Sequence, residues 1–223
     1  MSTFDIITTH DGSPTLQHSL LPETYHSKHG ARAESEHVFV RQGLEQIQAN
    51  PIHVFEVGFG TGLNAWLAGL WAQQQQTTVH YTGVELYPVP PAVAAQLNYG
   101  EPAAEFQLLH TLDWNTEHHP HAHFHFTKLH TSLFNFEASD NTYHLVFFDA
   151  FSPRTQMELW EVQVMQKMYA LLMPGGKLTT YCANGNVRRN MLAAGFEVQK
   201  KPGPPFKREM LVATKPFLNN TQA

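Results

Sequence analysis

Cysteine and charged side chains are scarce in this chain of 223 residues. The one cysteine, Cys182, excludes an internal disulfide and a zinc site built from cysteines. Only 15% of the residues are charged and 42% are apolar, which excludes disorder, collagen and coiled coils. The longest apolar stretch, residues 63–72, is half as long as a membrane-spanning helix, and residues 1–10 lack the Lys or Arg of a signal peptide. We therefore expect a globular, cytoplasmic protein with no membrane partner.

Basic residues are rare in the first two-thirds of the chain. Residues 1–153 hold four Lys or Arg against fifteen Asp or Glu, whereas residues 154–223 hold ten against four. A basic third within a chain of net charge −5 indicates a local surface for a polyanion. The alternative is that these cations merely solvate the faces of helices and strands.

The pattern of apolar residues predicts one α/β domain over residues 51–217, preceded by an extension over residues 1–50 that packs on it. The extension contains short strands around Asp11-Gly12 and a helix over residues 33–49. After it, predicted strands (52–57, 79–86, 123–129, 143–148, 177–182) alternate with predicted helices (63–73, 91–97, 103–112, 155–172, 187–194). This alternation indicates a mostly parallel, doubly wound sheet, which an antiparallel C-terminal hairpin (197–200 and 209–213) completes. A ligand crevice is expected beyond the carboxyl ends of the first strands.

Three glycines, Gly58, Gly60 and Gly62, follow the first strand of this domain. Their spacing differs from the dinucleotide fingerprint, which would have a glycine at Leu63, and no P-loop motif is present. The pattern E-x-G-x-G-x-G resembles that of Rossmann-like methyltransferases that bind S-adenosylmethionine (SAM). The alternative is a glycine-rich turn without a ligand, in which each glycine would weaken the fold by about 0.5–1 kcal/mol.

Glu85 ends the next predicted strand, where a carboxylate can accept hydrogen bonds from both hydroxyls of a ribose. Without the glycine turn beside it, Glu85 could equally well be a solvated acid at the end of a strand. Methyltransferases of this kind often place an Asp after the following strand to contact adenine, but this chain has His130-Thr131-Ser132 there. Asp113 is the candidate to replace it.

The strand over residues 143–148 leads into Asp149-Ala150-Phe151-Ser152-Pro153. This segment is similar to the D-P-P-Y motif of amino methyltransferases. The Asp149 carboxylate and the Ala150 carbonyl can hold the N–H groups of an amine, and Phe151 can stack on a base. The alternative role for Asp149 is to cap the helix that follows. Methyl transfer from a sulfonium requires no metal, and none is expected.

Together with the segments 183–189 and 207–211, these motifs give the chain a family resemblance. It resembles the tRNA methyltransferases that complete 5-methylaminomethyl-(2-thio)uridine at the wobble position, which occur as the methyltransferase half of bifunctional MnmC and as stand-alone MnmD. The resemblance implies SAM-dependent methylation of the 5-aminomethyl nitrogen. It assigns catalysis to Asp149 and Phe151, and cofactor binding to Glu56, Gly58, Gly60, Gly62, Asn64 and Glu85. Asp113 is added only as the substitute for the Asp that the family has at the position of Thr131. No flavin-dependent half is evident, so the aminomethyl form of the nucleoside is the expected substrate.

The resemblance gives the basic third of the chain a use, namely the phosphates of the tRNA anticodon stem-loop. The candidates are Arg188, Arg189, Lys200, Lys201, Lys207 and Arg208. A wobble uridine in a loop can enter a pocket without melting a duplex. Two other functions fit the same motifs, a methyltransferase of small amines and a catalytically silent RNA-binding module.

Histidines crowd into residues 118–125, and all fifteen lie at or before His144. Because no cysteine or ordered carboxylate is seen to join them, we expect a solvated loop and edge strand there and no metal site. His26 lies in an N-terminal segment that the family folds near the crevice. It is either a base for the substrate ammonium or a packed or surface histidine.

Overall fold

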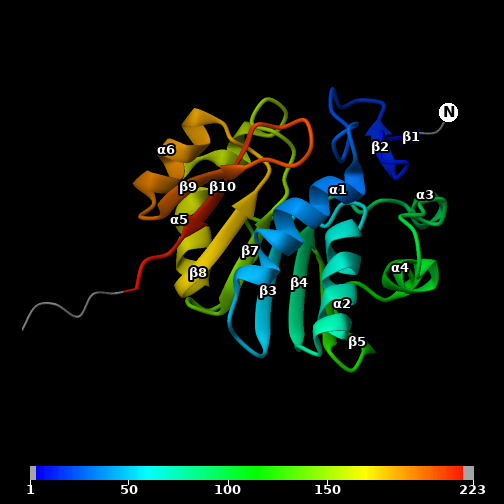
Figure 1. The fold of residues 1–223 in the computed structure, drawn as a ribbon, viewed down its shortest axis with the longest axis horizontal. Helices are drawn as coiled ribbons and strands as arrows, with labels where there is room; N and C mark the ends of the chain where they lie inside the picture. Colours follow the sequence, from blue (N-terminus) through cyan, green and yellow to red (C-terminus); the bar gives the residue numbers. More distant parts are fainter. Residues whose placement is uncertain (1–3, 218–223) are drawn as a thin grey trace, which may run out of the picture.

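A computed structural model of the chain describes residues 4–217 (Figure 1). Its centre is an eight-stranded sheet in the order β5-β6-β4-β3-β7-β8-β10-β9. The run from β6 to β8 is parallel, whereas β5, β10 and β9 each pair antiparallel to a neighbour. The strands are β3 (Ile52–Val57), β4 (Val79–Glu85), β5 (Glu117–His121), β6 (Phe124–His130), β7 (Tyr143–Phe148), β8 (Leu172–Thr180), β9 (Glu197–Pro202) and β10 (Glu209–Thr214). The predicted mostly parallel sheet with an antiparallel C-terminal hairpin is confirmed.

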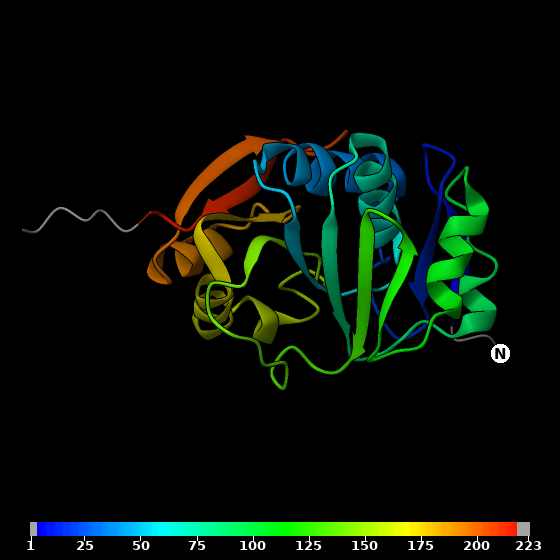
Figure 2. The ribbon, with the colours of Figure 1, turned by 90° about the horizontal axis from the view of Figure 1, so that it is seen from below.

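Helices cover both faces of this sheet, which is why its central strands are apolar runs without alternation. Figure 2 shows α1 (Ala31–Ser35) and α2 (Leu63–Gln75) over one face and α5 (Val162–Leu171) over the other. The first face packs Phe39, Trp66 and Phe147 into one core cluster. The second face packs Phe148 and Met165 into another, which α6 (Gly185–Ala193) also joins. Within residues 4–217, no helix combines the length and the apolar character that crossing a bilayer demands.

Three predicted helices are shorter than their apolar patterns indicate. The expected helix over residues 33–49 is divided into α1, a π-helical turn (Glu36–Arg41) and a short 3-10 turn (Leu44–Gln46). The break lies at Gly43, whose backbone is not helical, and only glycine fits there because a Cβ would lie 2.2 Å from the carbonyl oxygen of Phe39. The pattern over residues 155–172 divides at Glu161, whose extended backbone separates a 3-10 turn (Met157–Trp160) from α5. The remaining helices are α3 (Pro91–Ala94), which ends earlier than the predicted residue 97, and α4 (Ala103–Thr111).

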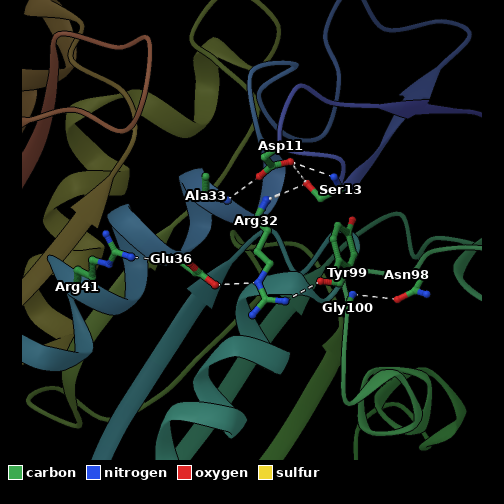
Figure 3. A network of polar contacts seen from close by, with 9 residues as sticks. All are labelled: Asp11, Ser13, Arg32, Ala33, Glu36, Arg41, Asn98, Tyr99 and Gly100. Carbon is green, nitrogen blue, oxygen red and sulfur yellow. Dashed lines mark hydrogen bonds and ion pairs between the residues drawn. The ribbon is translucent and has the colours of Figure 1, made fainter.

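The N-terminal residues form a hairpin of β1 (Phe4–Thr8) and β2 (Pro14–His18), with the turn at Asp11-Gly12 as expected. Figure 3 shows how polar contacts attach this hairpin to α1. Asp11 accepts hydrogen bonds from the backbone N–H groups of Ser13 and Ala33, both at 3.0 Å. Burial raises the pKa of the Asp11 carboxyl, but hydrogen bonds from Ser13, Thr9 and Ala33 outweigh it and lower that pKa to about 2. The carboxylate is therefore ionised at neutral pH and holds the hairpin to the helix.

Arg32 extends the same network from α1 toward the loop before α4 (Figure 3). Its Nε lies 2.8 Å from Glu36, and one of its terminal nitrogens donates to the carbonyl of Tyr99, also at 2.8 Å. The guanidinium also lies over the Trp66 ring of α2 at 5.3 Å. Arg32 thus ties α1 to α2 and to the loop on that side of the sheet.

Candidate active site

A cavity of about 1030 Å³ lies at the carboxyl ends of the central strands. Its lining comes from the turns after β3, β4, β6 and β7, within residues 57–64, 84–90, 130–134 and 149–152, and from the N-terminal segment 20–28. The chain runs from β3 to β4 on one side, and β7 pairs with β3 on the other. This is the switch point at which open α/β sheets bind their ligands, as the strand pattern predicts.

The glycine turn after β3 comes into direct contact with the turn after β7. Gly58 has a φ of +86°, and a Cβ on it would lie 2.8 Å from the carbonyl oxygen of Asp149. Gly62 has a φ of +76°, and a Cβ there would lie 2.9 Å from the Phe59 ring. Both positions require glycine for conformation and for space.

Glu85 is held at the edge of the cavity by the backbone. Its Oε2 accepts a hydrogen bond of 3.0 Å from the Gly60 N–H, and its Oε1 accepts one of 2.8 Å from the Tyr87 N–H. Each carboxylate oxygen keeps a lone pair for a further donor. Glu85 therefore faces the cavity as a fixed double acceptor, the arrangement that suits the two hydroxyls of a ribose.

Asn64, in the first turn of α2, connects two carboxylates beneath the cavity. Its Nδ2 donates to Glu56 Oε1 at 2.9 Å and to Asp149 Oδ2 at 2.8 Å. Glu56 is fully buried and does not line the cavity, and burial raises the pKa of its carboxyl well above the usual range. Glu56 thus supports Asn64 from below and is not placed to contact a ligand.

Asp149 lines the cavity directly after β7. Burial raises the pKa of its carboxyl to about 7, against the opposing effect of the hydrogen bond from Asn64. The negative charge of Glu34 raises this pKa further, and the positive charge of Lys207 lowers it. Its side chain bonds to Asn64, and Gln156 occupies the N-cap position of the next helical turn, so Asp149 does not cap that turn.

Lys207 reaches the cavity from the loop between β9 and β10. Its ammonium forms an ion pair with the buried Glu34 of α1 and lies 4.4 Å from the centre of the Tyr181 ring. The Tyr181 hydroxyl donates a 2.9 Å hydrogen bond to the Ala150 carbonyl. That carbonyl, which the sequence offers to an amine, thus already has one donor and keeps one free lone pair.

Phe151 meets the N-terminal segment across the cavity. Its ring packs edge-on against Tyr25, with the ring centres 5.1 Å apart. Beside it, the Ser152 N–H donates to Glu23 at 3.0 Å, and the Ser152 hydroxyl bonds the same carboxylate. The segment 20–28 is thereby fastened to the Asp149–Pro153 turn and forms one wall of the cavity.

His26 also lines the cavity, and burial lowers the pKa of its imidazole to about 4. Its ring nitrogens lie 3.4 Å from the hydroxyls of Thr15 and Thr61. The ring is therefore neutral at pH 7 and a weaker base than an exposed histidine.

The structure brings most of the predicted cofactor and catalytic residues together. Gly58, Gly60, Asn64, Glu85, Asp149 and Phe151 line the one cavity. Gly62 shapes the turn, and Glu56 lies behind it. Asp113 is the exception, because it is exposed, its carbonyl accepts from His118 at 3.1 Å, and its charge acts on Lys128. Asp113 does not line the cavity, whereas residues 130–134 line it beside Glu85.

The six predicted RNA-binding cations are distributed over α6, β9 and the loop between β9 and β10. Lys207 points into the cavity, and Lys200 forms an ion pair of 2.8 Å with Glu209. Lys200 and Lys201 are consecutive on β9 and so face opposite sides of the sheet. Arg188 and Arg189 lie on α6, and Arg208 lies next to Lys207 beside a second, shallow pocket.

Sequence reasoning does not identify four residues that line the cavity. Glu23 and Glu34 come from the N-terminal part of the chain, and Tyr181 and Lys207 from its C-terminal part. The sequence does not indicate that Glu34 is buried at the cavity, because an acid in a helix is usually solvated. Lys207 falls within a segment of the family resemblance, where its charge suggests a phosphate contact.

The comparisons with known proteins agree with this geometry. Residues 110–216 match the family model described as S-adenosyl-L-methionine-dependent methyltransferase. The chain is 32% identical to the tRNA 5-methylaminomethyl-2-thiouridine biosynthesis bifunctional protein MnmC of Cupriavidus necator, over 86% of this chain and 32% of that protein. It is 31% identical to the protein of the same name from Caulobacter vibrioides, over 92% of this chain and 37% of that protein. The chain therefore spans about a third of the length of these curated relatives.

A crystal structure of MNMC2 from Aquifex aeolicus is similar to the fold over nearly its whole length. It matches with a TM-score of 0.80 and 28% identity, over 97% of this chain and 72% of that chain. The expected Rossmann-like methyltransferase fold is confirmed by this match together with the sheet order.

Proposed function

We propose that this chain, which is similar to MnmC proteins and matches a family model of S-adenosyl-L-methionine-dependent methyltransferases, methylates a primary amine on a tRNA base. The amine is the 5-aminomethyl group of (2-thio)uridine at the wobble position, and the product is 5-methylaminomethyl-(2-thio)uridine. The names of the MnmC relatives support this substrate class. The observation that carries the proposal is Asp149, whose carboxylate lines the same cavity as the glycine turn.

The residues of the cavity fit SAM. Glu85 offers both carboxylate oxygens to the ribose, and the glycine turn leaves no Cβ where the nucleoside approaches. Asn64 Oδ1 is buried and has no hydrogen-bond partner among the described residues, so it can accept from a bound amino group. Residues 130–134, on the Glu85 side of the cavity, would face the adenine. SAM supplies a methyl group that its sulfonium charge already activates.

Asp149 prepares the amine. A primary amine in solution is an ammonium at neutral pH and has no lone pair to give. With a pKa raised to about 7, the Asp149 carboxylate can take one proton from that ammonium and hold the remaining N–H groups. The nitrogen lone pair then forms the new C–N bond as the methyl–sulfur bond breaks, and the sulfur keeps that electron pair. The secondary ammonium that results leaves after Asp149 releases its proton to water.

The base itself is held by aromatic contacts. Phe151 and Tyr25 meet edge to face at one side of the cavity, so one of the two rings can present its face to a uracil. A wobble uridine that leaves its stack would insert between this pair and Asp149. Arg188 and Arg189 would contact phosphates of the anticodon stem-loop from α6.

A transfer assay with tritiated SAM tests the proposal and separates it from two alternatives. The substrate is bulk tRNA that lacks the final methyl group, with tRNA that carries it as the matched control. Label in the first tRNA alone supports the proposal. Label only in small amines would identify a small-amine methyltransferase, and tRNA binding without transfer would identify a silent RNA-binding module.

A further inference from the structure

A row of histidine rings crosses the sheet at the end opposite the cavity. The rings belong to β7, β3, β4, β6 and β5, in the order His144, His53, His80, His125 and His119. Neighbouring ring centres in this row lie 5.6, 4.8, 4.2 and 4.3 Å apart. The strand register causes the row, because His53 pairs with His80 and His80 pairs with His125. None of these residues lines the cavity.

The face that carries this row is only partly covered. The helices α5 and α6 pack against the β7–β8 side of it, and the connection from β6 to β7, residues 131–142, forms no helix. Four of the five residues, His53, His80, His125 and His144, are therefore only partly buried, and His119 is exposed.

The structure places the carboxylate of Glu117, which precedes His118 in the sequence, beside this row. Glu117, on the edge strand β5, pairs with Thr127 of β6 and so shares a face with His125, two residues away. Its Oε1 lies 3.5 Å from His125 Nδ1. One ligand atom each from His80, Glu117 and His125 lies within 4.8 Å of the others.

We propose that His80, Glu117 and His125 form a binding site for one divalent transition-metal ion, with zinc as the best match. Two imidazoles and a carboxylate are the donor set of many zinc sites with an open position. Zinc bonds of 2.0–2.2 Å in a tetrahedron place the ligand atoms about 3.4 Å apart. The Glu117–His125 spacing already fits, and a small rotation of the His80 side chain brings in the third ligand. A water molecule or the adjacent His119 completes the tetrahedron.

The expectation of no metal near residues 118–125 rests on the lack of an ordered carboxylate there. Glu117 supplies that carboxylate at the edge of the sheet. A bound ion would join the edge strand β5 to β6 and β4 through side chains, in addition to the irregular ladder of β5 and β6. It would act on stability at a distance from the methyl-transfer site.

Isothermal titration of the full untagged chain with zinc chloride tests the site. We expect one zinc per chain, and binding at least about tenfold weaker in His125→Ala and in Glu117→Gln. Glu117 has a half-exposed side chain, so its conservative substitution leaves the fold intact. His118→Ala is the matched control, because His118 pairs with the buried Phe126 and lies on the other face of β5. It should bind zinc as the unchanged chain does.

Thermal unfolding gives a second measurement. Zinc should raise the Tm of the unchanged chain and of His118→Ala, and should raise that of Glu117→Gln by less at the same zinc concentration, since a ligand stabilises the folded state according to its affinity for it. Absence of a stoichiometric site in the unchanged chain would overturn the proposal. Equal zinc binding in Glu117→Gln and His125→Ala to that of the unchanged chain would overturn it as well.

Discussion

The amide of Asn64 donates a 2.8 Å hydrogen bond to the carboxylate of Asp149. The same nitrogen donates to Glu56 at the end of β3, so one side chain joins the glycine turn to the turn after β7. Asn64, which the sequence assigns to the cofactor, thus also affects the position and the pKa of Asp149, which it assigns to the amine. A change at Asn64 should therefore affect both halves of the site.

Replacement of Asp149 by Ala should abolish methyl transfer and leave SAM bound. Loss of a positioned acid–base group lowers a rate by about 10²–10⁴. Single-turnover rates with tRNA and titration calorimetry with SAM measure the two effects. Asp140→Ala, an exposed acid outside the cavity, is the control. Full activity in Asp149→Ala would remove Asp149 from the mechanism.

The pH dependence of the reaction should report the ionisation of Asp149. For the free enzyme, kcat/KM should rise with pH through a step near 7, because only the carboxylate can accept a proton. Lys207→Met removes a positive charge and should move this step to higher pH. Glu34→Gln removes a negative charge and should move it to lower pH. Shifts of the same sign in both variants would contradict this assignment.

Asp149→Asn should be more stable than the unchanged chain at pH 8. The pKa of the Asp149 carboxyl is raised from 3.8 to about 7 on folding, so the folded state resists its ionisation. That cost is absent below pH 3.8, grows as the pH rises toward 7 and is constant above it. At about 1.4 kcal/mol per pKa unit it is at most about 4 kcal/mol. Urea unfolding at pH 8 and pH 4.5 measures it, and an equal gain at both pH values would refute the argument.

Gly58→Ala should destabilise the fold and weaken SAM binding together. A left-handed residue with a Cβ costs about 1–3 kcal/mol, and this Cβ would also meet the Asp149 carbonyl at 2.8 Å. A destabilisation of about 2 kcal/mol lowers the Tm by about 4–8 °C in a chain of this size. Gly12→Ala is the matched control, since its φ of +83° is similar and nothing lies within 4 Å of the added Cβ. It should lose less stability and keep its SAM affinity.

Arg188→Ala combined with Arg189→Ala should weaken tRNA binding and reduce its salt dependence. For each phosphate that the protein no longer neutralises, the slope of log affinity against log salt becomes shallower by about 0.7–0.9. Filter binding between 50 and 200 mM salt measures the slope, with the exposed Arg41→Ala as a control away from α6. A slope equal to that of the unchanged chain would exclude these two arginines from the interface.

The sheet and the floor of the site are predictable because they depend on local sequence. Apolar runs such as residues 52–57 and 143–148 are strands, and the residues that follow them must lie at one edge of the sheet. Gly58, Glu85 and Asp149 are identified in this way. The glycine spacing further selects the class of ligand.

The walls of the cavity are not predictable, because they depend on contacts between distant parts of the chain. Glu34 and Lys207 lie 173 positions apart and meet only in the folded protein. The apolar pattern also predicts one helix over residues 33–49, but the structure breaks it at Gly43, which packs closely on Phe39 and Phe147. Asp113 is a candidate only by its position along the chain, and the fold turns it toward Lys128.

The antiparallel insertion of β10 between β8 and β9 determines when the cavity gains its cation. Since this pairing positions the β9–β10 loop, a partly folded chain without the hairpin lacks the Lys207 ammonium at the cavity and leaves Glu34 without its ion pair. The Asp149 carboxyl then lacks a positive charge that lowers its pKa, even when the rest of the sheet and its nucleoside-binding turn have formed. Loosening of this hairpin alone would therefore move the reaction toward higher pH while most of the secondary structure persists.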